Sequence, residues 1–238
     1  ENQARWCLDG RHNHVVLENK ILNDQAMKKY WFIHVMCALW VSTLPGCLST
    51  RSDSPEIHTY QLGLDEQRSE VRREPLDGPV LLVSPPQAEP GFETQRMVYV
   101  KRPFQIEYFA VNEWADAPVR MLAPLMVHAL NHSGTWQAVI PLPSSIPGDY
   151  RLDTYGFLLQ HEFIQQPSRV RIMARLQLVD LKESTIVGTR SFETVEKAPS
   201  ENAYGGVLAA NRAVAGLLDQ IMSWLQQCIR RSPECGRS

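Results

Sequence analysis

Apolar residues recur with two different periods along the chain, and the period separates strands from helices. From Arg169 to Val179 apolar and polar side chains alternate, which is typical of a strand with one face on a core. A short continuous apolar run at 79–84 lies between Gly78 and a pair of prolines, which favours a buried strand. Patterns of these kinds predict strands over residues 57–62, 79–84, 96–100, 104–111, 135–140, 150–163, 169–179 and 185–195.

Two segments instead show the spacing of amphipathic helices, and Pro118 suits the first turn of the earlier one. The apolar face of 118–132 consists of Met121, Leu122, Leu125, Met126, Ala129 and Leu130. The apolar stripe of 203–231 consists of Val207, Ala210, Val214, Leu217, Leu218, Ile221, Leu225 and Cys228. Gly205 and Gly206 are interpreted as local flexibility where this helix begins.

The pattern as a whole predicts one α/β domain over 57–231, followed by a tail over 232–238. In this domain two main helices pack on a mixed, largely antiparallel sheet, as a layered α/β sandwich.

A different pattern precedes the domain. Lys28 and Lys29 stand before 15 residues, 30–44, that contain no Asp, Glu, Lys or Arg, and the run ends at Leu44-Pro45-Gly46-Cys47. A basic start, a short apolar stretch, a small residue and a cysteine follow one another in this order in bacterial lipoprotein signals. The pattern predicts cleavage between Gly46 and Cys47 and acylation of Cys47. A transmembrane helix needs about 20 apolar residues, so the run fits a signal better.

Two alternatives stay open for this segment. In the first alternative, the segment is a buried core helix. In the second, it is an uncleaved membrane anchor, and residues 1–26 are a cytoplasmic tail. Pro45 stands where lipoprotein signals usually carry Ala or Ser, so acylation follows less directly from the pattern than export does. On the signal interpretation, 1–26 is an upstream extension without predicted structure, 27–46 is the signal peptide, and 47–56 is the lipid anchor and tether.

Charge and cysteine content narrow the choice of partners and compartment. The chain has 24 Lys plus Arg and 26 Asp plus Glu, with a formal net charge of −2. This balance gives no reason to expect nucleic acid, which usually requires a basic face. Beyond Cys47 the cysteines are Cys228 and Cys235. An oxidising compartment would permit a disulfide between them, and two unpaired thiols are the alternative.

The sequence carries no established catalytic motif. Gly-x-Ser-x-Gly elbows, Gly-rich phosphate loops and Ser-x-x-Lys are all missing. His128 and His132 are four apart on a predicted helix, but Ala129 stands where a metalloprotease helix carries Glu, so a surface pair is the default. Asp149 and Asp153 would lie about 13 Å apart in a strand, too far for a carboxylate pair. We therefore expect no catalytic residue, no cofactor and no metal.

Several segments, in their order along the chain, resemble a known family. They are Ile57-His58-Thr59-Tyr60-Gln61-Leu62, Arg96-Met97-Val98-Tyr99, Ile106-Glu107-Tyr108-Phe109, Trp114-Ala115-Asp116-Ala117-Pro118 and Tyr150-Arg151-Leu152-Asp153, and a last helix that contains Trp224. Over roughly 57–228 the chain resembles the auxiliary lipoprotein component of ABC-type transport systems, the family of paraquat-inducible protein C.

This resemblance implies a non-catalytic, periplasm-facing lipoprotein of Gram-negative bacteria. It would accompany a permease and a mammalian-cell-entry domain subunit that move lipids between the inner and outer membranes, and self-association is left open. The functional residue that carries over is Cys47. Leu48, where Asp would retain the protein at the inner membrane, implies an outer-membrane anchor. Tyr108 and Trp114 would be motif positions, and Trp114 is expected to pack the following helix onto the sheet.

Two rival functions remain. One is a membrane-anchored cell-envelope hydrolase, which would need a pocket with converging catalytic groups. The other is a structural envelope lipoprotein without a transporter.

Overall fold

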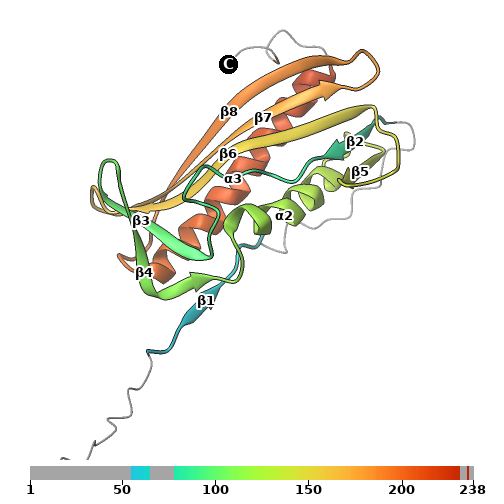
Figure 1. Ribbon diagram of the computed structural model, residues 1–238. Helices are drawn as coiled ribbons and strands as arrows, with labels where there is room; N and C mark the ends of the chain where they lie inside the picture. Colours follow the sequence, from blue (N-terminus) through green and yellow to red (C-terminus); the bar gives the residue numbers. More distant parts are fainter. Residues whose placement is uncertain (1–54, 65–77, 231–234, 236–238) are drawn as a thin grey trace, which may run out of the picture. The chain divides into compact units, whose positions relative to one another are not determined.

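The computed structural model describes residues 55–64, 78–230 and 235, which form an eight-stranded mixed sheet and two long helices (Figure 1). Gly46, Cys47 and the rest of the predicted signal and anchor up to residue 54 lie outside the described residues. The elements are β1 (His58–Tyr60), β2 (Val80–Val83), β3 (Arg96–Arg102), β4 (Gln105–Trp114), α2 (Pro118–His132), β5 (Ala138–Pro141), β6 (Tyr150–Glu162), β7 (Arg169–Asp180), β8 (Thr185–Lys197) and α3 (Ala203–Ile229).

Strand β6 organises the sheet. One of its edges pairs with β7 along nearly the whole strand, and β7 pairs in turn with β8. Its other edge is divided, because the start of β6 pairs with β2 and the end pairs with β3. β5 extends the sheet beyond β2, while β4 and β1 extend it beyond β3. On this side of β6 the sheet therefore has two separate arms.

The predicted class, a mixed sheet with two main helices, is confirmed, but the largely antiparallel arrangement holds for only part of the sheet. Among the described strands, β3–β4, β6–β7 and β7–β8 are antiparallel, whereas β1–β4, β2–β5, β2–β6 and β3–β6 are parallel. The antiparallel pairs join consecutive strands, where a short polar turn signals a hairpin. The parallel pairs join strands that other elements separate, so no local pattern reports them.

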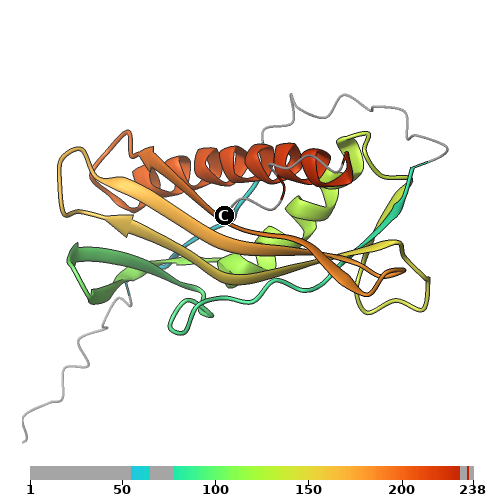
Figure 2. The same cartoon turned by 90° about the horizontal axis from the view of Figure 1, so that it is seen from above.

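Both helices pack against the same face of the sheet (Figure 2). The alternating residues of β7 from Val170 to Leu178 are at most 3 % exposed and lie under α3. Thr154 of β6 is paired with Leu176 of β7, and its hydroxyl lies 4.0 Å from Sδ of Met126 in α2. One apolar core therefore lies between the sheet and the two helices.

The helices match their predicted positions closely. α2 has the predicted bounds, and the whole predicted stripe of α3 is buried. In α2, Leu122, Met126 and Leu130 are buried, whereas Met121 and Leu125 are only partly buried. This helix therefore turns a narrower face to the core than its apolar residues suggest.

The end of α3 is fastened to the chain beyond it. Cys228 and Cys235 form a disulfide, which decides between the two alternatives that the sequence left open. Nε1 of Trp224 donates a hydrogen bond to the carbonyl oxygen of Cys235 at 3.1 Å. The Trp224 ring also packs edge-on against Phe192 of β8, with centroids 5.6 Å apart. The disulfide thus holds Cys235 over the β8 side of the core.

The start of α3 lies close to β6, and this proximity corrects the interpretation of the two glycines. Asn202 caps the helix by accepting a hydrogen bond from the Gly205 amide at 2.8 Å. A Cβ at Gly206 would stand only 2.6 Å from Nδ1 of His161, a buried residue of β6. Gly206 is therefore needed for close packing of helix on strand rather than for flexibility.

We expect Gly206→Ala to destabilise the domain, although alanine is the better helix former. Overpacking against buried His161 costs about 1–3 kcal/mol, which exceeds the gain of up to about 1 kcal/mol from helix propensity. Gly216→Ala in the same helix is the matched control, because its Cβ would lie 3.4 Å from Cγ2 of Thr194. Urea unfolding should show a lower midpoint for Gly206→Ala than for Gly216→Ala. Equal midpoints would contradict the packing role.

Candidate functional site

The predicted lipidation and cleavage residues, Cys47 and Gly46, precede the first described residue, Pro55. From there the chain forms β1, which runs parallel to the end of β4 with His58 opposite Asn112. The Tyr60 ring lies 6.2 Å from the ring of Tyr204 in the first turn of α3. The N-terminal attachment of the domain is therefore fixed to β4 and to the start of α3.

The motif positions named by the resemblance have structural roles. Trp114 ends β4 just before α2, is 2 % exposed and belongs to the apolar core, as expected. Tyr108 lies under the guanidinium of Arg96, 3.8 Å from the ring centroid. These contacts are packing contacts, and neither of them brings reactive groups together.

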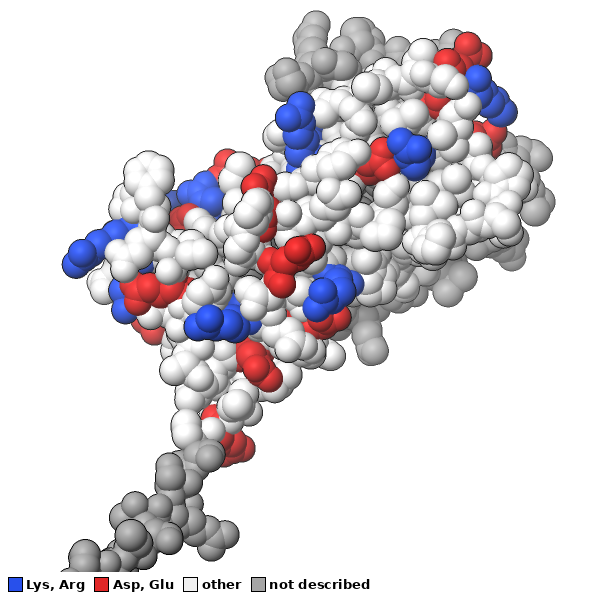
Figure 3. Space-filling view, viewed as in Figure 1, with Lys and Arg blue, Asp and Glu red and all other residues white. Residues whose placement is uncertain are grey.

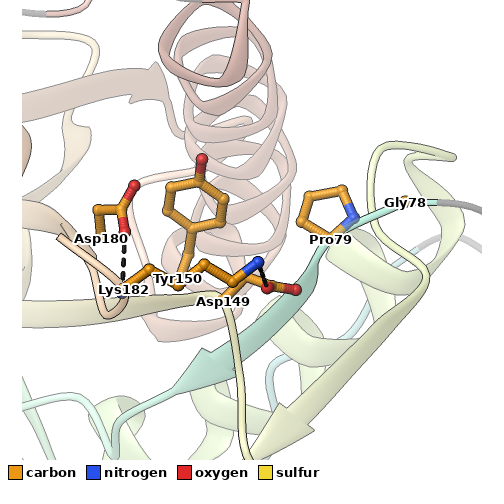
Figure 4. A pocket seen from close by; sticks show the side chains of 6 residues that line it. All are labelled: Gly78, Pro79, Asp149, Tyr150, Asp180 and Lys182. Atoms are coloured by element: carbon orange, nitrogen blue, oxygen red, sulfur yellow. Dashed lines mark hydrogen bonds and ion pairs between the residues drawn. The ribbon is translucent and has the colours of Figure 1, made fainter.

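A polar hollow of about 310 Å³ lies where β2 and β6 begin and β7 ends (Figure 4). It is lined by Gly78, Pro79, Asp149, Tyr150, Asp180 and Lys182. Figure 4 shows that the charged groups come from the segment before β6, from the end of β7 and from the β7–β8 turn.

Each charged group in the hollow already has a partner. Nζ of Lys182 lies 2.7 Å from Oδ1 of Asp149, whose other oxygen accepts the Val80 amide at 2.8 Å. The hydrogen bond from Lys182 lowers the pKa of Asp149, and the Val80 amide lowers it further. Asp180 accepts the amides of Lys182 and Glu183 within the turn. These bonds hold the β7–β8 turn to the start of the sheet, and they occupy both carboxylates of the hollow.

A second arrangement resembles a hydrolytic centre more closely. Nε2 of His161, in β6, lies 2.9 Å from Oγ of Ser168, just before β7. The Ser168 amide donates to Oε1 of Glu201 at 2.8 Å. A histidine within hydrogen-bond reach of a serine is the arrangement that activates a nucleophile.

Burial removes the chemistry from this pair. Ser168 is 0 % and His161 2 % exposed, so no substrate reaches the hydroxyl. Burial lowers the pKa of His161 to about 4, against a weaker opposite effect of Glu201. Such a histidine is neutral at pH 7 and is a weak base. Glu201 binds the Ser168 backbone rather than Nδ1 of His161, and Nδ1 has no partner among the described residues. We interpret the pair as a buried structural contact.

The His161–Ser168 contact was not among the sequence predictions. The two residues are close because the β6–β7 hairpin brings Glu162 opposite Arg169. The two consecutive strands predicted over 150–163 and 169–179 were the one signal that pointed to their proximity. The sequence pattern did not indicate that the start of α3 would cover His161 and Ser168.

The face of the sheet away from the helices is polar and internally paired. Arg171 of β7 binds Glu162 of β6 at 2.7 Å and also pairs with Glu193 of β8. Burial raises the pKa of Glu162, but hydrogen bonds from Arg171 and Gln160 outweigh it, so the pKa is lowered overall. Basic and acidic side chains are interspersed on the face that Figure 3 displays. This surface offers no single-sign field to a charged ligand.

The described residues offer neither a metal cluster nor a membrane span. His128 and His132 lie side by side, with ring centroids 4.2 Å apart, but no group of three or more metal-ligating residues occurs within 55–64, 78–230 and 235. Neither of the helices in this part of the chain is long and apolar enough to cross a bilayer.

Comparison with known proteins places the fold. A family model described as ABC-type transport auxiliary lipoprotein component matches residues 60–222. A crystal structure of a Xanthomonas campestris protein matches at 19% identity with a TM-score of 0.63, over 74% of this chain and 97% of that one. The crystal structure of an uncharacterized protein matches at 16% identity with a TM-score of 0.54, over 71% of this chain and 99% of that one. Curated proteins give no match. At these identities the structural matches establish the fold alone.

The buried His161 predicts a loss of stability in mild acid. Its pKa is about 4 in the folded protein and 6.5 when unfolded, so between these values the unfolded chain binds more protons. The contribution of His161 to the free energy of unfolding is complete above pH 6.5 and falls by roughly 3 kcal/mol towards pH 4. Urea unfolding at several pH values should show this slope in the wild type and a weaker slope in His161→Gln, which can still bond to Ser168.

His58→Gln is the control, because His58 is exposed and should leave the slope unchanged. An identical slope in His161→Gln and wild type would refute the assignment.

Proposed function

The chain belongs to the family of ABC-type transport auxiliary lipoprotein components, and on that premise we propose that it is a periplasm-facing, non-catalytic component of a lipid transport system. The system would move lipids between the inner and outer membranes, through a permease and a mammalian-cell-entry domain subunit. The observation that carries this proposal is the family match over residues 60–222, which runs from β1 well into α3.

The disulfide supports the proposed compartment. Disulfides persist in oxidising environments such as the periplasm and are rare in the cytosol. Cys228 and Cys235 are bonded at the end of α3 and are 2 % and 4 % exposed. A domain exported behind the segment 27–46 would acquire this bond outside the cytoplasm.

We assign the anchor to Cys47. Each buried methylene contributes about 0.8 kcal/mol, so one acyl chain binds a membrane only marginally and stable attachment needs more than one. A bacterial lipoprotein cysteine carries three chains, which would make the attachment effectively permanent. Leu48 after the cysteine favours release to the outer membrane, so the domain would face the periplasm from that side.

The geometry supports a non-catalytic role over the rival hydrolase. The Ser–His contact of His161 and Ser168 is closed to solvent, and Lys182 and Asp149 of the polar hollow bind each other. A hydrolase needs a nucleophile or a base that a substrate can reach. The domain would therefore act by holding partners at the membrane.

The anchor assignment predicts a specific effect of Cys47→Ala in the native bacterium. The wild type should fractionate with the outer membrane, and mass spectrometry should find an acylated N-terminal peptide that begins at Cys47. Cys47→Ala should accumulate with residues 27–46 attached, without lipid, and be lost from the outer membrane. Cys37→Ala, within the apolar run, is the matched control and should behave as the wild type. A wild-type chain that keeps residues 27–46 in cells would disprove the anchor.

The transport assignment predicts partners. Full-length protein with a C-terminal tag, extracted from cross-linked membranes, should bring down a mammalian-cell-entry domain subunit and a permease. Cys47→Ala should recover less of both, because the domain is no longer held at the right membrane. Recovery of neither from the wild type would favour the structural envelope lipoprotein instead.

A further inference from the structure

Three large apolar side chains are exposed together at one end of the domain. The β3–β4 hairpin and the β6–β7 turn lie side by side there, because the Phe163 amide donates to the carbonyl oxygen of Val100 at 2.8 Å (Figures 1 and 2). Phe104 is 107 %, Ile106 41 % and Ile164 52 % exposed. We call Phe104, Ile106 and Ile164 the apolar tip.

Phe104 is costly to the folded domain in two ways. Its ring is fully exposed at the hairpin turn. Its backbone φ is 65°, a value that residues other than Gly, Asn and Asp rarely adopt. A glycine there would relieve the strain and would remove the exposed ring. A strained aromatic residue that stays fully exposed on the described part of the domain points to a contact outside it.

Two basic residues precede the apolar tip. Lys101 and Arg102 are exposed immediately before the turn. Lys101 is 3.6 Å from Glu107 and lies over the Tyr99 ring, whereas Arg102 makes no ion pair with any described residue. The nearby acid Glu162 is bound by Arg171. Apolar side chains with cations beside them fit the boundary between acyl chains and anionic headgroups.

The chain enters the domain from the same end. β4 runs away from the apolar tip and β1 runs parallel to it, so the residues just before His58 lie on the tip side of β1. Asn112, which is opposite His58, is at most about 27 Å along β4 from Phe104. The 11 steps from Cys47 to His58 reach at most about 40 Å. A bilayer that holds Cys47 is therefore within reach of the apolar tip.

We propose that the apolar tip inserts into the bilayer surface that holds the acylated Cys47, which gives the anchored domain a second point of contact and a fixed orientation. This proposal rests on the lipid anchor of the proposed function. The occupant is the lipid surface, chosen over a protein partner because the chain enters the domain at the same end as the tip and because Arg102 there is a cation that no described acid pairs with. Phe104 and Ile164 would enter the interface, with Lys101 and Arg102 at the headgroups.

Tryptophan fluorescence tests the insertion directly. Trp6, Trp31 and Trp40 precede Cys47, and the remaining Trp114, Trp136 and Trp224 are at most 2 % exposed. Phe104→Trp therefore adds the one exposed tryptophan to the processed lipoprotein. The acylated full chain is reconstituted in vesicles of phosphatidylethanolamine and phosphatidylglycerol, with or without bromine on the acyl chains. The expected result is a shift of the added emission to shorter wavelength and its loss in brominated vesicles.

Ile186→Trp is the matched control. Ile186 is 61 % exposed beside the β7–β8 turn, at the opposite end of the domain. The variant should keep the emission of an exposed tryptophan with both kinds of vesicle. Equal quenching at both positions would show contact without orientation and would overturn the proposal.

The other outcomes separate the two proposals. If the Phe104→Trp protein floats with the vesicles but its added emission is not quenched, the anchor stands and the tip proposal fails. If the protein does not float, the anchor fails and the tip proposal fails with it. If the added emission of Phe104→Trp shifts on raising the protein concentration without vesicles, a second copy of the chain covers the apolar tip, and the lipid assignment is wrong.

Discussion

The architecture depends on how the two edges of β6 are satisfied. One edge of β6 pairs with β7 along nearly its whole length. The other edge bonds to three separate segments: β2 at the start, residues 87–89 in the middle, and β3 at the end. The amide of Gln87 bonds to Thr154, and the Phe157 amide bonds back to Gln87. Because a buried unpaired backbone group costs about as much as a lost hydrogen bond, the chain must follow β6 in one direction from β2 to β3. The parallel pairings and the two separate arms result from this.

This constraint also explains which parts of the fold could be predicted. The elements themselves have local signals: alternation in β7, Pro118 at the start of α2, and a stripe along α3. The division of β6 has none. Near the middle of β6 the pairing with β7 is irregular between Tyr155 and Leu158, where Gly156 has a φ of +61° that suits glycine. A glycine in a strand indicates such a feature only in general terms, so the pairing of β2 and β3 with the same edge could not be read from the sequence.

The candidate chemistry shows the same limit. No local pattern pairs His161 with Ser168, because their contact needs the hairpin register. Their isolation from solvent further needs the start of α3, which approaches so closely that position 206 has to be glycine. Residues that look reactive by distance alone are made inert by packing. The opposite holds for Gly46 and Cys47, which the sequence identifies and the structure does not describe. Their signal is entirely local, and they lie outside the residues that the structure describes.

The two ends that the divided edge of β6 creates differ in chemistry, and the difference bears on how an anchored domain could work. At the β2–β5 end the charges are engaged in holding the β7–β8 turn, as in the pair between Lys182 and Asp149. At the β3–β4 end Phe104 and Arg102 are exposed and unengaged within the described domain, and the chain enters the domain at this end. A domain attached at its apolar end would direct the polar end away from the bilayer. On the proposed anchoring, a partner beyond the bilayer would meet the β7–β8 turn and the polar face of the sheet, whose paired charges make a surface suited to reversible contact rather than permanent burial.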